Sequence, residues 1–101
     1  MTIRHIVSWK LAATDEAERD AAFATMQSEL EALAGFMPDD IERLQVGRNI
    51  AYPESNWDVV LIADYASLDA LEAYQVHPEH QRVVGIIKPL VAERSNVDFE
   101  L

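Results

Sequence analysis

Two of the three histidines of this chain lie close together, in the segment that runs from Tyr74 to His80. Pro78 lies between them and suits the first position of a helix, because its ring fixes φ and its missing N–H is not needed there. His80 would then lie in the first turn, where the positive end of the helix dipole favours the neutral imidazole. A neutral imidazole can act as a general base near neutral pH, so His80 is the candidate base. His77, beside the proline, is expected to be a capping or surface residue.

His5 and Tyr74 are the other candidate catalytic residues. Apolar residues recur at every second position around His5, which predicts a strand with His5 on its more apolar face. Either residue would orient the base or donate a hydrogen bond to a developing enolate oxygen. Simpler interpretations stay open: His5 would be a core histidine with satisfied hydrogen bonds, and Tyr74 would pack with its hydroxyl at the rim. The segment from Tyr74 to His80 would then be only a corner between two helices.

A metal site is a further alternative, because His77, Glu79 and His80, joined by His5 on folding, would supply nitrogen and oxygen ligands. The chain has no His-Glu-x-x-His signature and no cysteine, and its three glycines are too scattered to form a phosphate-binding loop. We therefore expect no metal and no cofactor. The lack of cysteine also excludes disulfide and thiolate chemistry.

The length of 101 residues predicts a single domain over residues 1–101. The 18 acidic and 8 basic residues give a formal charge of -10, and a negative field repels phosphate backbones and anionic lipid head groups. Nucleic acid and membrane surfaces are therefore not expected partners. Arg4, His5 and Lys10 interrupt the apolar residues of the N-terminus, so no signal peptide is expected, and no apolar segment approaches the ~18 residues of a membrane span. These features predict a cytoplasmic protein.

Helix and strand patterns alternate along the chain. Asp15, followed by Glu18 three residues later, predicts a capping box at a helix start. The segment 57–65 is apolar on both faces and is expected in the middle of a sheet, while Gly47 suggests a bulge or a close backbone approach. The predicted elements are a strand at 3–11, a helix at 15–35, strands at 41–50 and 57–65, helices that begin at Ser67 and Pro78, and a strand at 96–101.

This order predicts an α+β fold, with a four-stranded antiparallel sheet and helices on one face, of the ferredoxin-like kind. The other sheet face, on which Ile6, Val60 and Ile62 are expected, would be left without cover. Packing of two such faces against each other would form a homodimer with a closed, barrel-like arrangement.

Several segments resemble landmarks of the stress-responsive dimeric α/β-barrel (Dabb) family, and the resemblance covers nearly the whole chain. They are Ile3-Arg4-His5-Ile6-Val7 with Lys10-Leu11, Gly47-Arg48-Asn49, Asp58, the helix at Ser67, and above all Tyr74-x-x-His77-Pro78-x-His80. The resemblance implies a ferredoxin-like subunit, a homodimer whose sheets form a barrel, and one pocket per subunit between the sheet and the helices.

Family members of known activity include a plant polyketide cyclase, which performs an intramolecular aldol condensation without a cofactor. Its catalytic histidine matches His80, and its pocket residues match His5 and Tyr74. This chain departs from the cyclase at two positions: the first helix has no tyrosine, and Val59 stands where the third strand of the cyclase carries a histidine.

Three classes of function follow from these residues. The first is a cofactor-free enzyme, a cyclase or aldol lyase or an oxygen-using enzyme, that acts on a small hydrophobic carbonyl compound. The second is a small-molecule binding protein that uses the same pocket, and the third is a structural or stress-related dimer without chemistry. If the pocket binds a substrate, its apolar end is expected to be formed by Phe23, Met26, Trp9, Val83 and Ile87.

Overall fold

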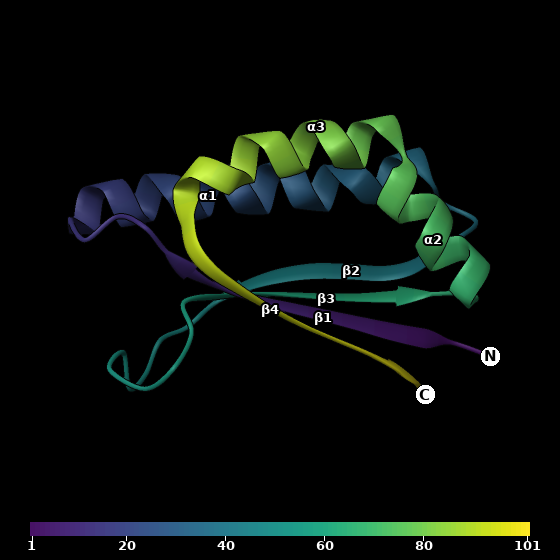
Figure 1. Ribbon diagram of the computed structural model, residues 1–101, viewed down its shortest axis with the longest axis horizontal. Coiled ribbons are helices and arrows are strands. Elements are labelled where there is room, and N and C mark those ends of the chain that lie inside the picture. Colours follow the sequence, from purple (N-terminus) through teal and green to yellow (C-terminus); the bar gives the residue numbers. More distant parts are fainter.

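The computed structural model describes residues 1–101, and it has a four-stranded antiparallel sheet with three helices on one face (Figure 1). The strand order is β2-β3-β1-β4, so β1 and β3 are the central strands. The predicted ferredoxin-like α+β fold is confirmed. Its elements are β1 (Ile3–Leu11), α1 (Glu16–Ala32), β2 (Ile41–Arg48), β3 (Val59–Tyr65), α2 (Leu68–Val76), α3 (Pro78–Ile87) and β4 (Val91–Glu100), with 3-10 turns η1 (Leu33–Phe36) and η2 (Lys88–Leu90).

The alternation of β1 separates the two faces of the sheet. Ile3, His5 and every second residue up to Leu11 are buried beneath the helices, on what we call the inner face. The residues between them are only partly buried and lie on the outer face. His5 pairs in register with Ala63 of β3 and with Asp98 of β4, so the side chain of Asp98 shares the inner face with His5.

Each long helix begins at a side chain that accepts a hydrogen bond from its first turn. The carboxylate of Asp15 accepts from the N–H of Glu18, and the hydroxyl of Ser67 accepts from the N–H of Ala70. Nδ1 of His77 accepts from the N–H of Glu79, and the donor–acceptor distance is 3.1 Å in all three bonds. The reciprocal bond of a capping box, from the side chain of Glu18, does not form. Because His77 ends α2 and begins α3, the two helices meet at a corner, with Pro78 at the first position of α3.

Two expectations about the strands are wrong. The register irregularity of β2 lies between Ile41 and Arg43, not at Gly47, and a Cβ placed on Gly47 would lie 3.6 Å from Val60, an ordinary contact distance. The last strand begins at Val91 instead of residue 96. After the half-buried Val91, residues 92–95 are exposed and show no apolar alternation, so pairing with β1 makes this half a strand.

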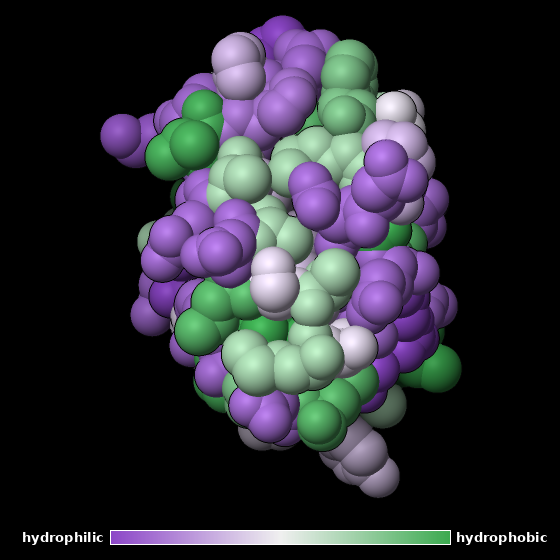
Figure 2. Space-filling model, turned by 90° about the vertical axis from the view of Figure 1, so that its right-hand side faces the viewer, coloured by the Kyte–Doolittle hydropathy of each residue, from purple (hydrophilic) through white to green (hydrophobic).

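The outer face carries apolar residues that no helix covers. Ile6, Val60 and Ile62 lie on it as expected, and Val97 and Phe99 of β4, which pair with Ile6 and Arg4, join them. Val97 is 56% exposed and Phe99 41% exposed. Figure 2 shows the molecule from the end at which both termini lie. Apolar surface is more continuous in the lower half of this view, on the sheet side, than in the upper half, where the helices lie. None of the helices is long and apolar enough to cross a membrane.

Candidate functional site

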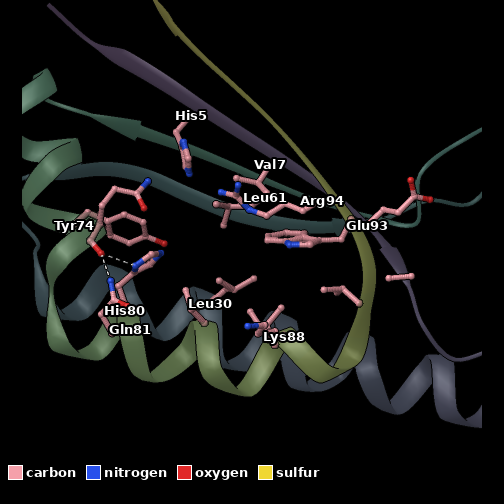
Figure 3. Close-up of a pocket in the computed structure, with 16 residues that line it drawn as sticks. His5, Val7, Leu30, Leu61, Tyr74, His80, Gln81, Lys88, Glu93 and Arg94 are labelled. Carbon is pink, nitrogen blue, oxygen red and sulfur yellow. Dashed lines mark hydrogen bonds between the residues drawn. The ribbon is translucent and has the colours of Figure 1, made fainter.

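A cavity of about 660 Å³ lies between α3 and the sheet edge at which β4 pairs with β1 (Figure 3). β4 follows η2 at the end of α3, so the chain turns back along the sheet there (Figure 1). Residues on both sides of this turn line the cavity, among them Ile87 of α3 and Val91 of β4. Apolar side chains from β1, β3, β4 and two helices form much of its wall: Val7, Trp9, Leu30, Leu61, Val84, Ile87 and Val91. Its polar side chains include His5, Tyr74, Gln75, His80, Gln81, Lys88 and Arg94.

His80 lies in the first turn of α3 and contributes its imidazole to the cavity wall (Figure 3). Its Nδ1 lies 3.1 Å from the carbonyl oxygen of Gln75. Because a carbonyl oxygen only accepts, Nδ1 carries the proton, and Nε2 of the neutral ring is left with a free lone pair. Burial lowers the pKa of His80 below its usual value, against the hydrogen bond to Gln75, which favours the charged form. The neutral form, which can accept a proton, is therefore favoured.

Tyr74 of α2 lies between the two histidines of the cavity. Its ring centroid is 4.3 Å from that of His80 and 6.4 Å from that of His5. Its side chain is nearly inaccessible, and its hydroxyl has no hydrogen-bond partner, so the expectation of a hydroxyl at the rim is wrong. Burial raises the pKa of Tyr74 to about 12, so the hydroxyl stays protonated at neutral pH. It is a buried donor in need of an acceptor.

His5 is bound to a carboxylate from the neighbouring strand. Nδ1 of His5 donates a hydrogen bond to Oδ1 of Asp98, its register partner on β4. The ring of His5 is 2% exposed and lies edge-on to the rings of Tyr65 and Tyr74. The interpretation of His5 as a buried, hydrogen-bonded histidine is therefore correct. His5 also lines the cavity, so its ring is available to a ligand.

His77 is occupied elsewhere. Its Nδ1 caps α3 and its ring lies 6.0 Å from that of Phe36, so the expected capping role is confirmed. The chain contains no group of three or more His, Asp or Glu side chains placed to hold a metal ion. The alternative of a metal site built from His77, Glu79, His80 and His5 therefore has no support in the geometry.

Residues 3–101 match the stress-responsive A/B barrel domain. The chain belongs to this family. Among curated protein sequences, none matches it. The family match covers all elements of the fold and every residue of the cavity.

Solved structures of this fold agree with the family assignment. A dimeric protein of unknown function with a ferredoxin-like fold from Bacteroides fragilis has a TM-score of 0.87 at 28% identity, over 99% of this chain and 96% of its own. A dimeric ferredoxin-like protein from Thermobifida fusca has a TM-score of 0.80 at 31% identity, over 100% of this chain and 92% of its own. A hydroxynitrile lyase from Passiflora edulis shares the fold, with a TM-score of 0.75 at 12% identity, over 97% and 91% of the two chains.

The prediction of the residues that form the apolar end of the pocket is only partly correct. Trp9 and Ile87 line the cavity, but Phe23, Met26 and Val83 do not. Met26 and Val83 are completely buried in the core between the helices and the sheet, and Phe23 packs beneath the guanidinium of Arg48. Neighbouring positions replace them: Leu30 lies one turn beyond Met26, and Val84 follows Val83.

Five polar residues that line the cavity are missing from the sequence-based prediction: Gln75, Gln81, Lys88, Glu93 and Arg94. Asp98, which binds His5 from β4 without lining the cavity, is missing as well. Asp98 had a detectable signal, since it lies between Val97 and Phe99 and must face away from them. A register between the first and last strands would have placed it beside His5. The role of Gln75 comes from its backbone carbonyl, which no side-chain pattern reveals.

Proposed function

We propose that this protein binds a small, largely apolar carbonyl compound in the cavity and that His80 removes a proton from the carbon next to the carbonyl group. The observation that carries the proposal is the hydrogen bond from Nδ1 of His80 to the carbonyl of Gln75. It holds the ring in one tautomer and leaves Nε2 as the proton acceptor. The apolar wall of the cavity suits a substrate with a hydrocarbon body and few polar groups.

In the proposed step, Nε2 of His80 accepts the proton. The electron pair of the broken C–H bond forms the carbon–carbon double bond of the enolate, and the π electrons of the carbonyl group move onto its oxygen. The hydroxyl of Tyr74 donates a hydrogen bond to that oxygen as its negative charge develops. The support for this role is that the buried hydroxyl has no hydrogen-bond partner within the protein; the hydroxyl of Tyr65, whose ring centroid lies 5.1 Å from that of Tyr74, is likewise without one. Burial also raises the pKa of Tyr74 to about 12, so its hydroxyl keeps the proton. His5, held by Asp98, is a second polar group for orientation of the substrate.

The enolate formed in this way is the common intermediate of aldol and related carbon–carbon reactions. A hydroxynitrile lyase shares this fold, so the fold is compatible with an enzymatic role. The similarity is one of fold alone, so the substrate is inferred from the cavity and not from that enzyme.

Exchange of hydrogen for deuterium next to a ketone tests the proposal without knowledge of the natural substrate. In D₂O, 4-phenylbutan-2-one presents an apolar ring and one carbonyl group, and proton NMR follows the loss of its α-protons. The wild-type protein is expected to accelerate exchange above the buffer rate, and His80→Ala is expected to reduce the acceleration by about 100-fold or more. His77→Asn, which keeps the helix cap, is the matched control and should exchange like wild type. Equal exchange by wild type and His80→Ala would contradict the proposal.

A binding protein without chemistry is the second candidate. The observation in its favour is the open side of the cavity, where Ala92, Glu93 and Arg94 of β4 are exposed to solvent. Water at the reacting atoms weakens electrostatic stabilisation of an enolate. Saturable binding of 4-phenylbutan-2-one without any accelerated exchange would favour this candidate.

We also propose that two copies form a homodimer through their outer faces. The support is the exposed set of apolar residues on that face, together with the dimeric state of the structures from Bacteroides fragilis and Thermobifida fusca. This arrangement would leave the cavity of each subunit accessible, since the cavity lies on the inner face.

A further inference from the structure

The cavity contains two cations that no other group of the protein binds. Of the eight basic residues, Lys88 and Arg94 are the two whose side chains make neither a salt bridge nor a hydrogen bond, and both line the cavity. The remaining six are all engaged: Arg4, Lys10, Arg19, Arg43, Arg48 and Arg82. The chain has 18 acidic residues that could pair with its basic residues, yet these two cations in one cavity stay unpaired while the other six are bound.

Arg94 is placed to act on a ligand in the cavity. It pairs in register with Trp9 of β1 and so lies on the inner face, the side opposite to the proposed dimer contact. Its side chain extends from β4 into the cavity (Figure 3). Burial is the main cause of the raised pKa of Tyr74 and of the lowered pKa of His80; the charge of Arg94 opposes the first shift and adds to the second, which agrees with a guanidinium on the same side of the cavity as these groups.

The acidic residues near the cavity do not neutralise these cations. Glu93 also lines the cavity, but its carboxylate is bound by Lys10 at 3.3 Å. The carboxylate of Asp98 accepts hydrogen bonds from His5 and Asn96. The local positive groups therefore determine the sign that a ligand meets inside.

We propose that the ligand is an anionic amphiphile, an apolar body that carries a carboxylate, and that Arg94 binds the carboxylate with Lys88 in support. The inference rests on the proposed function, because it specifies the ligand of the same cavity. A planar guanidinium matches the two oxygens of a carboxylate, while an ammonium attracts it as a point charge. The apolar side chains Val7, Trp9 and Ile87 would contact the body of the ligand.

A matched pair of probes tests the inference. Calorimetric titration with 4-phenylbutanoate and with its neutral amide, 4-phenylbutanamide, is done at pH 8, where the acid is ionised and His80 is neutral. Because a hydrogen bond to a charged group contributes more than one between neutral groups, the acid is expected to bind about 10- to 100-fold more tightly than the amide. Arg94→Gln should remove most of this preference, and Lys88→Gln a smaller part.

Arg43→Gln is the control, because it removes the same charge from a guanidinium of β2 that lies outside the cavity. It should keep the full preference for the acid. The anionic ligand would be overturned if the wild type bound acid and amide equally, or if the double variant Arg94→Gln/Lys88→Gln kept the preference for the acid. Either result would leave the proposal of a carbonyl-binding cavity intact. Failure of the acid, the amide and 4-phenylbutan-2-one to bind would overturn the cavity as a ligand site, and this inference with it.

Discussion

A histidine works as a general base only when one ring nitrogen is free of a proton and faces the substrate. In this protein the backbone provides that condition for His80, since the carbonyl of Gln75 holds the proton on Nδ1. The carbonyl belongs to the last turn of α2, and the imidazole to the first turn of α3. The corner at His77 and Pro78 brings them together, so the local chain path orients the candidate base.

The pH dependence of exchange should follow the neutral form of His80. Burial lowers the pKa of His80, and the charges of His5, Arg94 and His77 act in the same direction. As the pH falls through this lowered pKa, Nε2 gains a proton and the rate declines, with a midpoint below the usual ~6.5. Stability shifts with the same sign: it is constant above ~6.5 and declines below that value, because the unfolded chain binds the proton more readily. A rate midpoint above 6.5 would show a different base.

His77 should matter for stability and not for chemistry. His77→Ala removes the acceptor for the N–H of Glu79 and is expected to lower the free energy of unfolding by about 0.5–2 kcal/mol. His77→Asn retains an acceptor at the cap and should lose much less. Chemical denaturation of the two variants and the wild type measures the difference, and equal stability of all three would show that the cap contributes nothing.

At the scale of elements, Asp58 connects three segments that meet beside the cavity. Its carboxylate accepts hydrogen bonds from the N–H of Leu11 at 2.8 Å and from the guanidinium of Arg19 at 2.9 Å. Its own N–H donates to the carbonyl of Trp9. One side chain thus joins the end of β1, the first turn of α1 and the segment before β3.

We expect Asp58→Ala to cost about 1–3 kcal/mol in the free energy of unfolding. It leaves the N–H of Leu11 without its acceptor, and the guanidinium of Arg19 keeps only its hydrogen bond to the carbonyl of Ala13. Glu54→Ala is a suitable control, since the Glu54 side chain is exposed and makes no hydrogen bond or ion pair. Thermal or urea unfolding gives both values. A loss no larger than that of the control would show that water replaces the Asp58 contacts.

The elements were largely predictable from the sequence, and the cavity was not. The period of two around His5 and the caps at Asp15 and Ser67 are local signals, and local patterns determine where such elements begin. Whether a helical side chain lines the cavity depends on which side of the helix faces the open edge of the sheet. Val83 and Val84 are adjacent and similar, yet only Val84 lines the cavity, because a step of one residue rotates a side chain by about 100°.

The polar half of the site was hidden for a related reason. Asp98 and Arg94 lie in a strand whose first half has no apolar alternation, so their positions depend on pairing with the distant residues of β1. His80, Tyr74 and His5 were found because their types are rare in the chain and their spacing matched a family pattern. The sequence therefore indicated the candidate base, His80. It did not indicate the carbonyl of Gln75 that binds its ring, the charged side chain of Arg94 in the cavity, or the carboxylate of Asp98 that binds His5.

For the whole molecule, the proposed homodimer depends on the outer face. Sedimentation of the wild type at micromolar concentration should give about twice the chain mass of 11.4 kDa. Ile62→Lys places a charge in the middle of the outer face and should shift the protein toward the monomer. Val76→Lys is the control, because Val76 of α2 is 74% exposed and lies away from the sheet. A monomeric wild type would exclude the barrel-like dimer.

The state of the His80 ring tests the proposed site most directly. Long-range proton–nitrogen NMR at pH 8, with resonances assigned through His80→Ala, distinguishes a ring nitrogen that carries a proton from one that does not. The geometry predicts a proton on Nδ1 and a bare Nε2, and it predicts that 4-phenylbutan-2-one shifts the signals of His80 and His5 but not those of His77. A proton on Nε2 of His80, or a ring that titrates as a freely exposed imidazole, would contradict the assignment of His80 as the base.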